Sequence, residues 1–336
     1  MPKAQAGDPS AQLALGRLYM TGDQVEPDTA LAVEWIRKSA LQGNPEAESL
    51  LAFAYERGEG VEADPFLALE WHEKAANQGV VASYAGVGRC YLYCKGMDAK
   101  PHAGVTWLRK GAKEGDVEAQ ALLGAVFLHG WGRTTVRSNK KLAERWLKAA
   151  AAQGRAQDQF NYAHMYYEND VFDDFALEPL RKSVAQDYPK AIVLLATMYR
   201  NGEGLPLDPA KAVELLSRDA VADYPSAQNE LGLAYREGNG IEQDVDESFR
   251  LFNKAGGQGY VEAQYNIALA YLDGLGVEKD TVRGYAWLRV CTAQSHRMAV
   301  RERGRRNDDI NKKEFLQARK IAEEIAATLP GAWSEE

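Results

Sequence analysis

Gln42-Gly43-Asn44 recurs as Gln78-Gly79-Val80 and again as Glu114-Gly115-Asp116, with the three glycines 36 residues apart. The same frame extends in both directions, to Gly7, Gly154, Asp187, Asp223, Gly259 and Ser295. Only the step of 39 residues to Gly154 and the following step of 33 residues depart from 36, and these two deviations cancel. A period in this range is typical of a solenoid of stacked helix pairs. We therefore expect an all-α chain with an extended surface rather than a catalytic pocket.

The second repeat shows why each period holds two helices. Asn44 can accept hydrogen bonds at the start of a helix, and Pro45 fits its first turn. Gly58 ends this helix, because glycine adopts the left-handed conformation of a helix C-terminus at little cost. Asp64 and Pro65 repeat the start signal and open a second helix.

Several columns of the repeat keep one residue type. Small residues that let helices approach closely recur at Gly16, Ala52, Gly88, Gly124, Ala163, Ala196, Gly232 and Ala268. A ring follows three positions later, at Tyr19, Tyr55, Tyr91, Phe127, Tyr166, Tyr199, Tyr235 and Tyr271. The second helices share Trp35, Trp71, Trp107, Trp146 and Trp287. Because these rings are periodic, we interpret them as core rather than as a ligand site.

Three stretches carry a family resemblance. They are Leu15-Gly16-Arg-Leu-Tyr19, Ala30-Leu-Ala-Val-Glu-Trp35 and Gly58-Glu-Gly60-Val61-Glu-Ala-Asp64. They look like Sel1-like repeats, relatives of the tetratricopeptide helix pairs, and the resemblance covers about residues 4–292. It implies a right-handed superhelical α/α solenoid of eight repeats at 4–292, followed by capping helices and a tail at 293–336.

Repeats four and five depart from the pattern. The loop of repeat four, from His129 to Asn139, is basic and three residues longer than the norm. Repeat five lacks the loop glycines, and Pro179 replaces the tryptophan, which should shorten or kink the second helix. Its acidic loop, 168–174, lacks the spacing and glycine of an EF-hand, so we favour a solvated loop over a calcium site. Drift in surface loops explains these departures, or else they form a bend or a partner-specific bulge in the middle of the solenoid.

The composition limits the class of protein. A formal charge of −8 and a pI near 5.4 argue against non-specific nucleic-acid binding. No apolar run approaches the roughly 20 residues of a membrane span. The N-terminus has no apolar signal segment, which predicts a cytoplasmic protein as written, or a periplasmic one if a leader has been removed. The odd number of cysteines argues against a disulfide framework, so Cys90, Cys94 and Cys291 are expected to be buried or ordinary thiols.

The sequence shows no catalytic or metal-binding motif. The histidines fall in separate repeats, at His72, His102, His129, His164 and His296. No H-E-x-x-H, G-x-S-x-G or phosphate-loop pattern occurs. Cys90 and Cys94 lack a second cysteine or histidine pair nearby, so a structural zinc site is not expected. We therefore predict no enzyme activity, no cofactor and no metal.

The resemblance to tetratricopeptide repeats places the first helices on a concave face. Columns six, ten and thirteen residues after each opening residue should face this groove, and they vary between repeats. We select as partner-binding residues Arg17, Phe53, Arg89, Phe160, His164, Tyr167, Arg200, Arg236 and Tyr265. Arginine and aromatic side chains are frequent anchors of interfaces, and the arginines would form a positive stripe on an acidic protein. The alternative is that some of them simply pack within the superhelix.

The favoured function is a non-catalytic scaffold or adaptor that binds a partner protein. The family resemblance implies bacterial signalling, envelope or virulence complexes, and one alternative is an immunity protein that neutralises a type VI secretion lipase effector. A hydrolase or cell-wall-binding protein of the cysteine-rich Sel1-like type is a weaker alternative, because the paired cysteines of that branch are absent. A basic run lies in the predicted cap and comprises Arg297, Arg301, Arg303, Arg305 and Arg306. We interpret it as a solvated helix face in preference to a binding site for an anionic partner.

Overall fold

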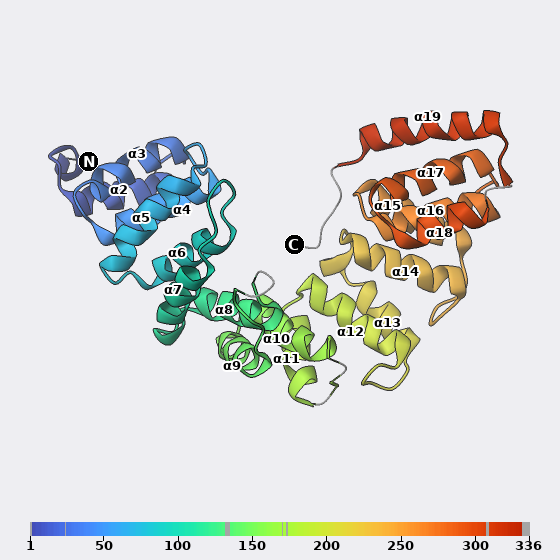
Figure 1. Ribbon diagram of the computed structural model, residues 1–336, viewed down its shortest axis with the longest axis horizontal. Coiled ribbons are helices and arrows are strands. Elements are labelled where there is room, and N and C mark those ends of the chain that lie inside the picture. The colour runs from blue at the N-terminus through green and yellow to red at the C-terminus, as the bar shows by residue number, and fades with distance from the viewer. Residues whose placement is uncertain are drawn as a thin grey trace. The chain divides into compact units, whose positions relative to one another are not determined.

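The computed structural model describes residues 2–23, 25–131, 135–169, 171–172, 174–306 and 309–330. In these ranges the regular structure is helical and contains no β-strand, apart from an isolated bridge between Trp131 and Val136. Consecutive helices pack as pairs along the chain (Figure 1). The predicted all-α fold of stacked helix pairs is confirmed.

The chain divides into two compact units, Met1–Met165 and Tyr166–Glu336. The helices that begin in the first unit are α1 (Pro2–Gln5), α2 (Pro9–Thr21), α3 (Thr29–Ala40), α4 (Pro45–Arg57), α5 (Pro65–Asn77), α6 (Val81–Tyr93), α7 (Pro101–Lys113), α8 (Val117–His129), α9 (Lys140–Ala151) and α10 (Ala156–Tyr167). Each even-numbered helix from α2 to α8 packs on the odd-numbered helix that follows it. We call the even-numbered helices the first helices and their partners the second helices.

The second unit continues the same alternation. Its helices are α11 (Asp174–Val184), α12 (Pro189–Asn201), α13 (Pro209–Leu216), the 3₁₀ turn η1 (Asp219–Val221), α14 (Pro225–Glu237), α15 (Val245–Gly257), α16 (Val261–Asp273), α17 (Thr281–Ala293), α18 (Arg297–Arg305) and α19 (Lys312–Thr328). Both α18 and α19 pack on α17. The predicted boundary at residues 292–293 follows the repeats rather than these compact units, and it stays a prediction.

The ends of the helices follow the predicted chemistry. Asp64 accepts hydrogen bonds from the backbone N–H groups of Phe66 and Leu67 at 2.9 and 3.0 Å, and Pro65 opens α5. Gly58 ends α4 with a φ of 71°, the left-handed conformation expected there. These local signals fix where each helix begins and ends.

Gly60 connects neighbouring repeats. Its φ is 70°, and a Cβ atom built on it would lie 2.3 Å from the carbonyl oxygen of Thr29 at the start of α3. Only glycine therefore allows this loop to lie against the preceding repeat.

The column of small residues forms the core between the helices, whereas only Tyr55 and Phe127 of the ring column that follows it are buried and its other rings are half-buried. The small residues Ala47 and Ala52 of α4 are fully buried, and Gly16 leaves room for Ile36. The tryptophans differ from the expectation, because Trp71 is buried whereas the other four are only half-buried. Cations lie over the rings of Trp35, Trp71, Trp107 and Trp146, and at Trp71 the Lys74 Nζ atom lies 3.9 Å from the ring centroid.

A ladder of glutamines joins successive repeats. The Gln42 side chain donates to Gln12 Oε1 at 2.8 Å, and Gln258 and Gln294 donate to Gln228 and Gln264 in the same way. Gln12 in turn donates to the carbonyl oxygen of Ala4, eight residues earlier. The ladder satisfies polar groups where the repeats meet and fixes their register.

In repeat five the second helix is shortened, as Pro179 predicts, although α13 of repeat six is shorter still, with 8 residues. Helix α11 contains Pro179 and spans 11 residues, two fewer than the longer second helices. Parts of both unusual loops lie outside the described residues, at Gly132–Thr134, Asp170 and Asp173. Consequently the calcium interpretation of the acidic loop is not tested.

Candidate functional site

The residues chosen from the groove columns all lie on first helices. Arg17 is exposed, and the other eight are half-buried. Five of them, Arg17, Phe53, Arg89, Phe160 and His164, belong to the first unit, and Tyr167, Arg200, Arg236 and Tyr265 belong to the second. Partial burial leaves each side chain able to contact a partner while it also packs within its unit.

The arginines reach from one first helix to the next. In the first unit, the Arg17 guanidinium donates to Glu46 at 2.9 Å and that of Arg89 donates to Glu118. In both cases the acceptor lies 29 residues further along the chain. We call such a contact an inter-repeat clasp.

Clasps of the same kind occur in the second unit. Arg200 donates to Glu230, and Arg236 donates to the Asn266 side chain at 3.0 Å, with separations of 30 residues. Burial raises the pKa of Glu230, although the contact with Arg200 opposes this effect. Because these arginines contact acidic or amide oxygens, part of their charge is balanced within the protein, and the positive stripe stays a prediction.

A hollow of about 660 Å³ opens between α2 and the start of α4 in the first unit. Its lining includes Ser10, Leu13, Ala14, Arg17, Pro45 and Glu46. The hollow thus combines apolar walls with the Arg17–Glu46 clasp, and the predicted partner-binding residue Arg17 is part of its lining.

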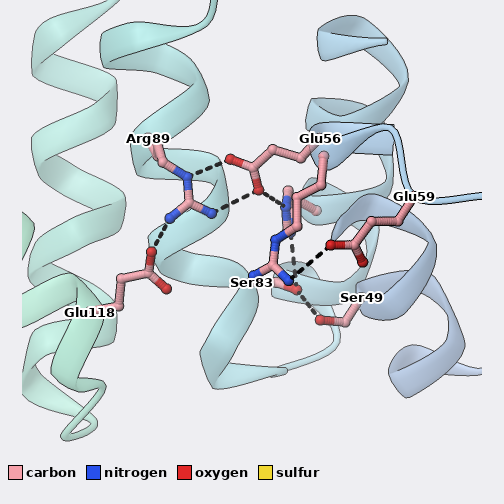
Figure 2. Close-up of polar contacts among 8 residues, drawn as sticks. Ser49, Glu56, Glu59, Ser83, Arg89 and Glu118 are labelled. Carbon is pink, nitrogen blue, oxygen red and sulfur yellow. Dashed lines mark hydrogen bonds and ion pairs between the residues drawn. The ribbon is translucent and has the colours of Figure 1, made fainter. Parts of the chain in front are cut away.

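A larger polar network joins three first helices, and Figure 2 shows it. Glu56 of α4 accepts hydrogen bonds from Arg89 of α6, and Arg89 also contacts Glu118 of α8. Burial alone would raise the pKa of Glu56, but hydrogen bonds from His72 and Arg89 outweigh it and lower that pKa to about 2. Glu56 is therefore ionised and holds the Arg89 side chain across neighbouring repeats.

The network continues into the core through His72 of α5. Its Nε2 atom lies 3.4 Å from Glu56 Oε2, and its Nδ1 atom lies 3.5 Å from Ser83 Oγ. Ser83 in turn donates to Ser49 Oγ at 2.9 Å (Figure 2). Phe53 packs edge-on against His72, with ring centroids 4.8 Å apart, so this predicted site residue borders the network.

The order serine, histidine, glutamate resembles that of a nucleophilic triad. Ser83 and His72 are both fully buried, with no exposed surface. Gly86 closes the site further, because a Cβ there would lie 2.4 Å from the His72 ring. A substrate cannot reach Ser83 Oγ in this arrangement, and the geometry supports a structural role.

Phe160, His164 and Tyr167 also contact other side chains of the protein. Phe160 and His164 lie on one side of α10, with ring centroids 5.2 Å apart. The Tyr167 hydroxyl donates to Glu203 at 2.8 Å. The structure therefore brings Phe160 to His164, and Phe53 to Arg89 through His72 and Glu56.

The cysteines are free thiols, with Cys90 and Cys291 buried and Cys94 half-buried, as predicted. Across the described residues, no three His, Cys, Asp or Glu side chains gather as metal ligands. Within the same part of the chain, no helix has the length and apolar character needed to cross a membrane.

Sequence reasoning missed the core part of the network. His72 stands in a column that is otherwise Ile36, Leu108, Leu147, Leu180, Leu216, Phe252 and Leu288. Ser83 stands in the column that elsewhere holds mostly alanine. These two exceptions were the sequence signal for the buried network, because a polar residue in a column of buried apolar residues needs a hydrogen-bond partner there.

Comparison with known proteins gives one family. The model described as Sel1 repeat matches residues 9–44, 45–80, 81–116, 117–154, 189–218, 225–260 and 261–289. Residues 155–188, where the sequence predicts the irregular fifth repeat, lie between two of these matches. No curated protein shows significant similarity to the chain.

Solved structures share the fold. A Sel1 repeat protein from Oxalobacter formigenes is 29% identical with a TM-score of 0.66, over 90% of this chain and 88% of that one. The protective antigen c5321 of uropathogenic Escherichia coli is 27% identical with a TM-score of 0.50, over 97% and 78%. The immunity protein Pa5087 of Pseudomonas aeruginosa is 23% identical with a TM-score of 0.38, over 57% and 70%, a similarity too low to transfer a role.

Proposed function

The chain belongs to the Sel1 repeat family, whose solenoids are generally non-catalytic scaffolds for protein interaction, and we propose that it binds a partner protein through its first helices. The hollow between α2 and α4 is the observation that carries this proposal. Its apolar walls can receive one apolar side chain of the partner, and the Arg17–Glu46 clasp supplies a polar rim. This combination is typical of an interface anchor.

The proposed activity is binding without catalysis. The Ser83–His72–Glu56 arrangement, which resembles a nucleophilic triad, is closed to substrate by its burial. We therefore expect the purified unchanged protein and the His72→Leu variant to give the same result in a broad hydrolase screen.

Filling the hollow tests the proposal. Ala14 is exposed in its wall, so Ala14→Trp should occupy the hollow without disturbing the core. Affinity capture from native lysate, quantified by mass spectrometry, should lose the partner by about tenfold or more. Asn77→Trp is the matched control, because Asn77 is exposed at the end of the second helix α5. Full capture by the Ala14→Trp variant would show that the hollow is not the site, and no capture by the unchanged protein would refute the function.

The immunity role is the more specific form of this proposal. If the captured partner is a type VI lipase effector, co-expression should give a stable one-to-one complex and abolish the lipase activity. A captured effector that remains active in the complex excludes this role and leaves a scaffold.

A further inference from the structure

Helix α18 occupies the place of a further first helix. Its N-cap, His296, follows Ser295, which is the last residue of the 36-residue frame. The His296 ring lies 4.9 Å from the Tyr265 ring of α16, and Arg306 contacts Asp273 of α16 at 2.9 Å. Helix α18 therefore extends the first-helix face of the second unit beside α16.

The outer side of α18 is cationic. No carboxylate in the described chain lies within ion-pair distance of Arg297, Arg301 or Arg303. The Arg305 side chain is 74% exposed, and the carboxylate that it contacts belongs to Glu302 of its own helix, at 3.4 Å. Residues 297–320 contain nine Lys or Arg against four Asp or Glu, in a chain whose net charge is −8.

Arg305 also completes a column. It lies ten residues after the opening residue of its repeat, as Arg17 and Arg89 do. Those two arginines form clasps with glutamates of the following first helix. Helix α19 packs on α17, and no carboxylate from a following first helix reaches Arg305 in the described chain. Arg305 of α18 thus occupies the position of a clasp arginine, but in the described chain no glutamate of a following first helix pairs with it.

Apolar side chains accompany these charges. Met298 is 50% exposed and Val300 is 46% exposed. Because they are two residues apart on an α-helix, their directions differ by about 160°, and they flank the arginines. A membrane-binding helix needs its apolar residues together on one face, so this arrangement favours a polypeptide over a lipid surface.

We propose that α18 and the neighbouring Tyr265 bind an acidic segment of a partner polypeptide. Carboxylates of this segment take the place of the next repeat's glutamate at Arg301 and Arg305, and its apolar side chains contact Met298 and Val300. The inference rests on the proposed scaffold function and adds the chemistry of the partner at this face. Arginine suits the role because its planar guanidinium pairs with a carboxylate through two parallel hydrogen bonds.

A labelled acidic peptide provides the direct test. The probe is a fluorescein-labelled peptide of four Glu-Leu-Glu-Gly repeats, and fluorescence anisotropy measures its binding to the full chain at 0.1 M salt. The double variant Arg301→Glu/Arg305→Glu should weaken binding by about tenfold or more, and added salt should weaken the unchanged protein's binding. The control is Arg250→Glu/Arg283→Glu, which reverses two exposed arginines on the second helices α15 and α17. Its affinity should stay within about twofold, and circular dichroism should show both double variants folded.

Three results would overturn the inference. They are no saturable binding of the acidic peptide, an equal loss in the Arg250/Arg283 control, and tight binding to phosphatidylserine vesicles that the peptide does not displace. Capture of the native partner separates this inference from the function on which it rests. If Arg301→Glu/Arg305→Glu captures the partner normally while Ala14→Trp loses it, only the acidic-segment inference fails. If the unchanged protein captures none, the scaffold function itself fails.

Discussion

Glu48 occupies a position that Gln12, Gln120, Gln228 and Gln264 fill in other repeats. It accepts a hydrogen bond from Gln78 at 2.7 Å, as the glutamines do from their own partners. Gln120 and Gln264 also donate to a carbonyl oxygen eight residues earlier, whereas an ionised carboxylate has no proton to donate. Burial raises the pKa of Glu48, against the lowering effects of Gln78 and Lys74.

Glu48→Gln should therefore stabilise the protein at neutral pH. A carboxyl with a raised folded-state pKa contributes its stability below its unfolded pKa and loses it as the pH rises through the folded value. The substitution should add up to about 1 kcal/mol to the free energy of unfolding at pH 7 and little at pH 4. Urea titrations at both pH values check this, and an equal gain at pH 4 would contradict the ionisation argument.

Glu56 behaves in the opposite sense. Its pKa falls from 4.5 to about 2 in the folded protein, so its contribution is present above about pH 4.5 and is lost as the pH falls toward 2. The shift corresponds to about 3 kcal/mol, which partial solvent exposure reduces to about 2. Glu56→Gln should cost about that much at pH 7 and flatten the acid side of the stability profile.

Glu59→Gln is the control for this substitution. Glu59, which is labelled in Figure 2, is half-exposed, and its Oε1 atom lies 3.7 Å from Arg57, a surface pair worth well under 1 kcal/mol. Thermal unfolding between pH 2 and pH 7 should separate the two variants. Matching acid profiles for both would place the pH dependence elsewhere than in the Glu56–Arg89 network.

At the scale of the helix and its loop, Gly60 gives the sharpest prediction. Gly60→Ala strains the backbone at a φ of 70° and places a methyl group 2.3 Å from the Thr29 carbonyl oxygen. We expect a loss of about 2 kcal/mol or more in unfolding free energy. Gly43→Ala is the matched comparison, because its φ is 79° but no atom lies within 4 Å of the added Cβ. If both variants lose the same stability, backbone strain alone explains the effect and the inter-repeat contact contributes nothing.

The elements were predictable because their signals are local. Asp64 and Gly58 mark helix ends through hydrogen bonds within a few residues, so one repeat contains all the information needed. The site was only partly predictable. A column indicates which way Arg89 points, but its partners Glu56 and Glu118 lie on two other helices, and the spacing of one repeat does not reveal them. The variable groove columns do not indicate the buried His72, because His72 is an exception in a core column that is otherwise apolar.

At the scale of the whole molecule, we expect the free energy of local unfolding to differ from one repeat to the next instead of having one value for the whole chain. Each repeat packs mainly on its neighbours, and the chain forms two compact units. In such a solenoid the free energy is approximately a sum of repeat and neighbour terms. A local defect is then expected to loosen nearby repeats first, which bears on the proposed function because the predicted partner-binding residues lie on both units.

Leu51→Ala and Ile267→Ala test this view as a pair. Both side chains are fully buried on first helices, Leu51 in the first unit and Ile267 in the second, so each substitution should cost about 3 kcal/mol. Native-state hydrogen exchange should show Leu51→Ala lowering protection in α4 to α6 while α14 to α16 keep theirs, and Ile267→Ala should do the reverse. If either variant lowers protection equally in both units, the chain unfolds as a single cooperative body. A partner bound to one unit would then stabilise the other equally, whereas under nearest-neighbour coupling its protection stays with the helices that it contacts.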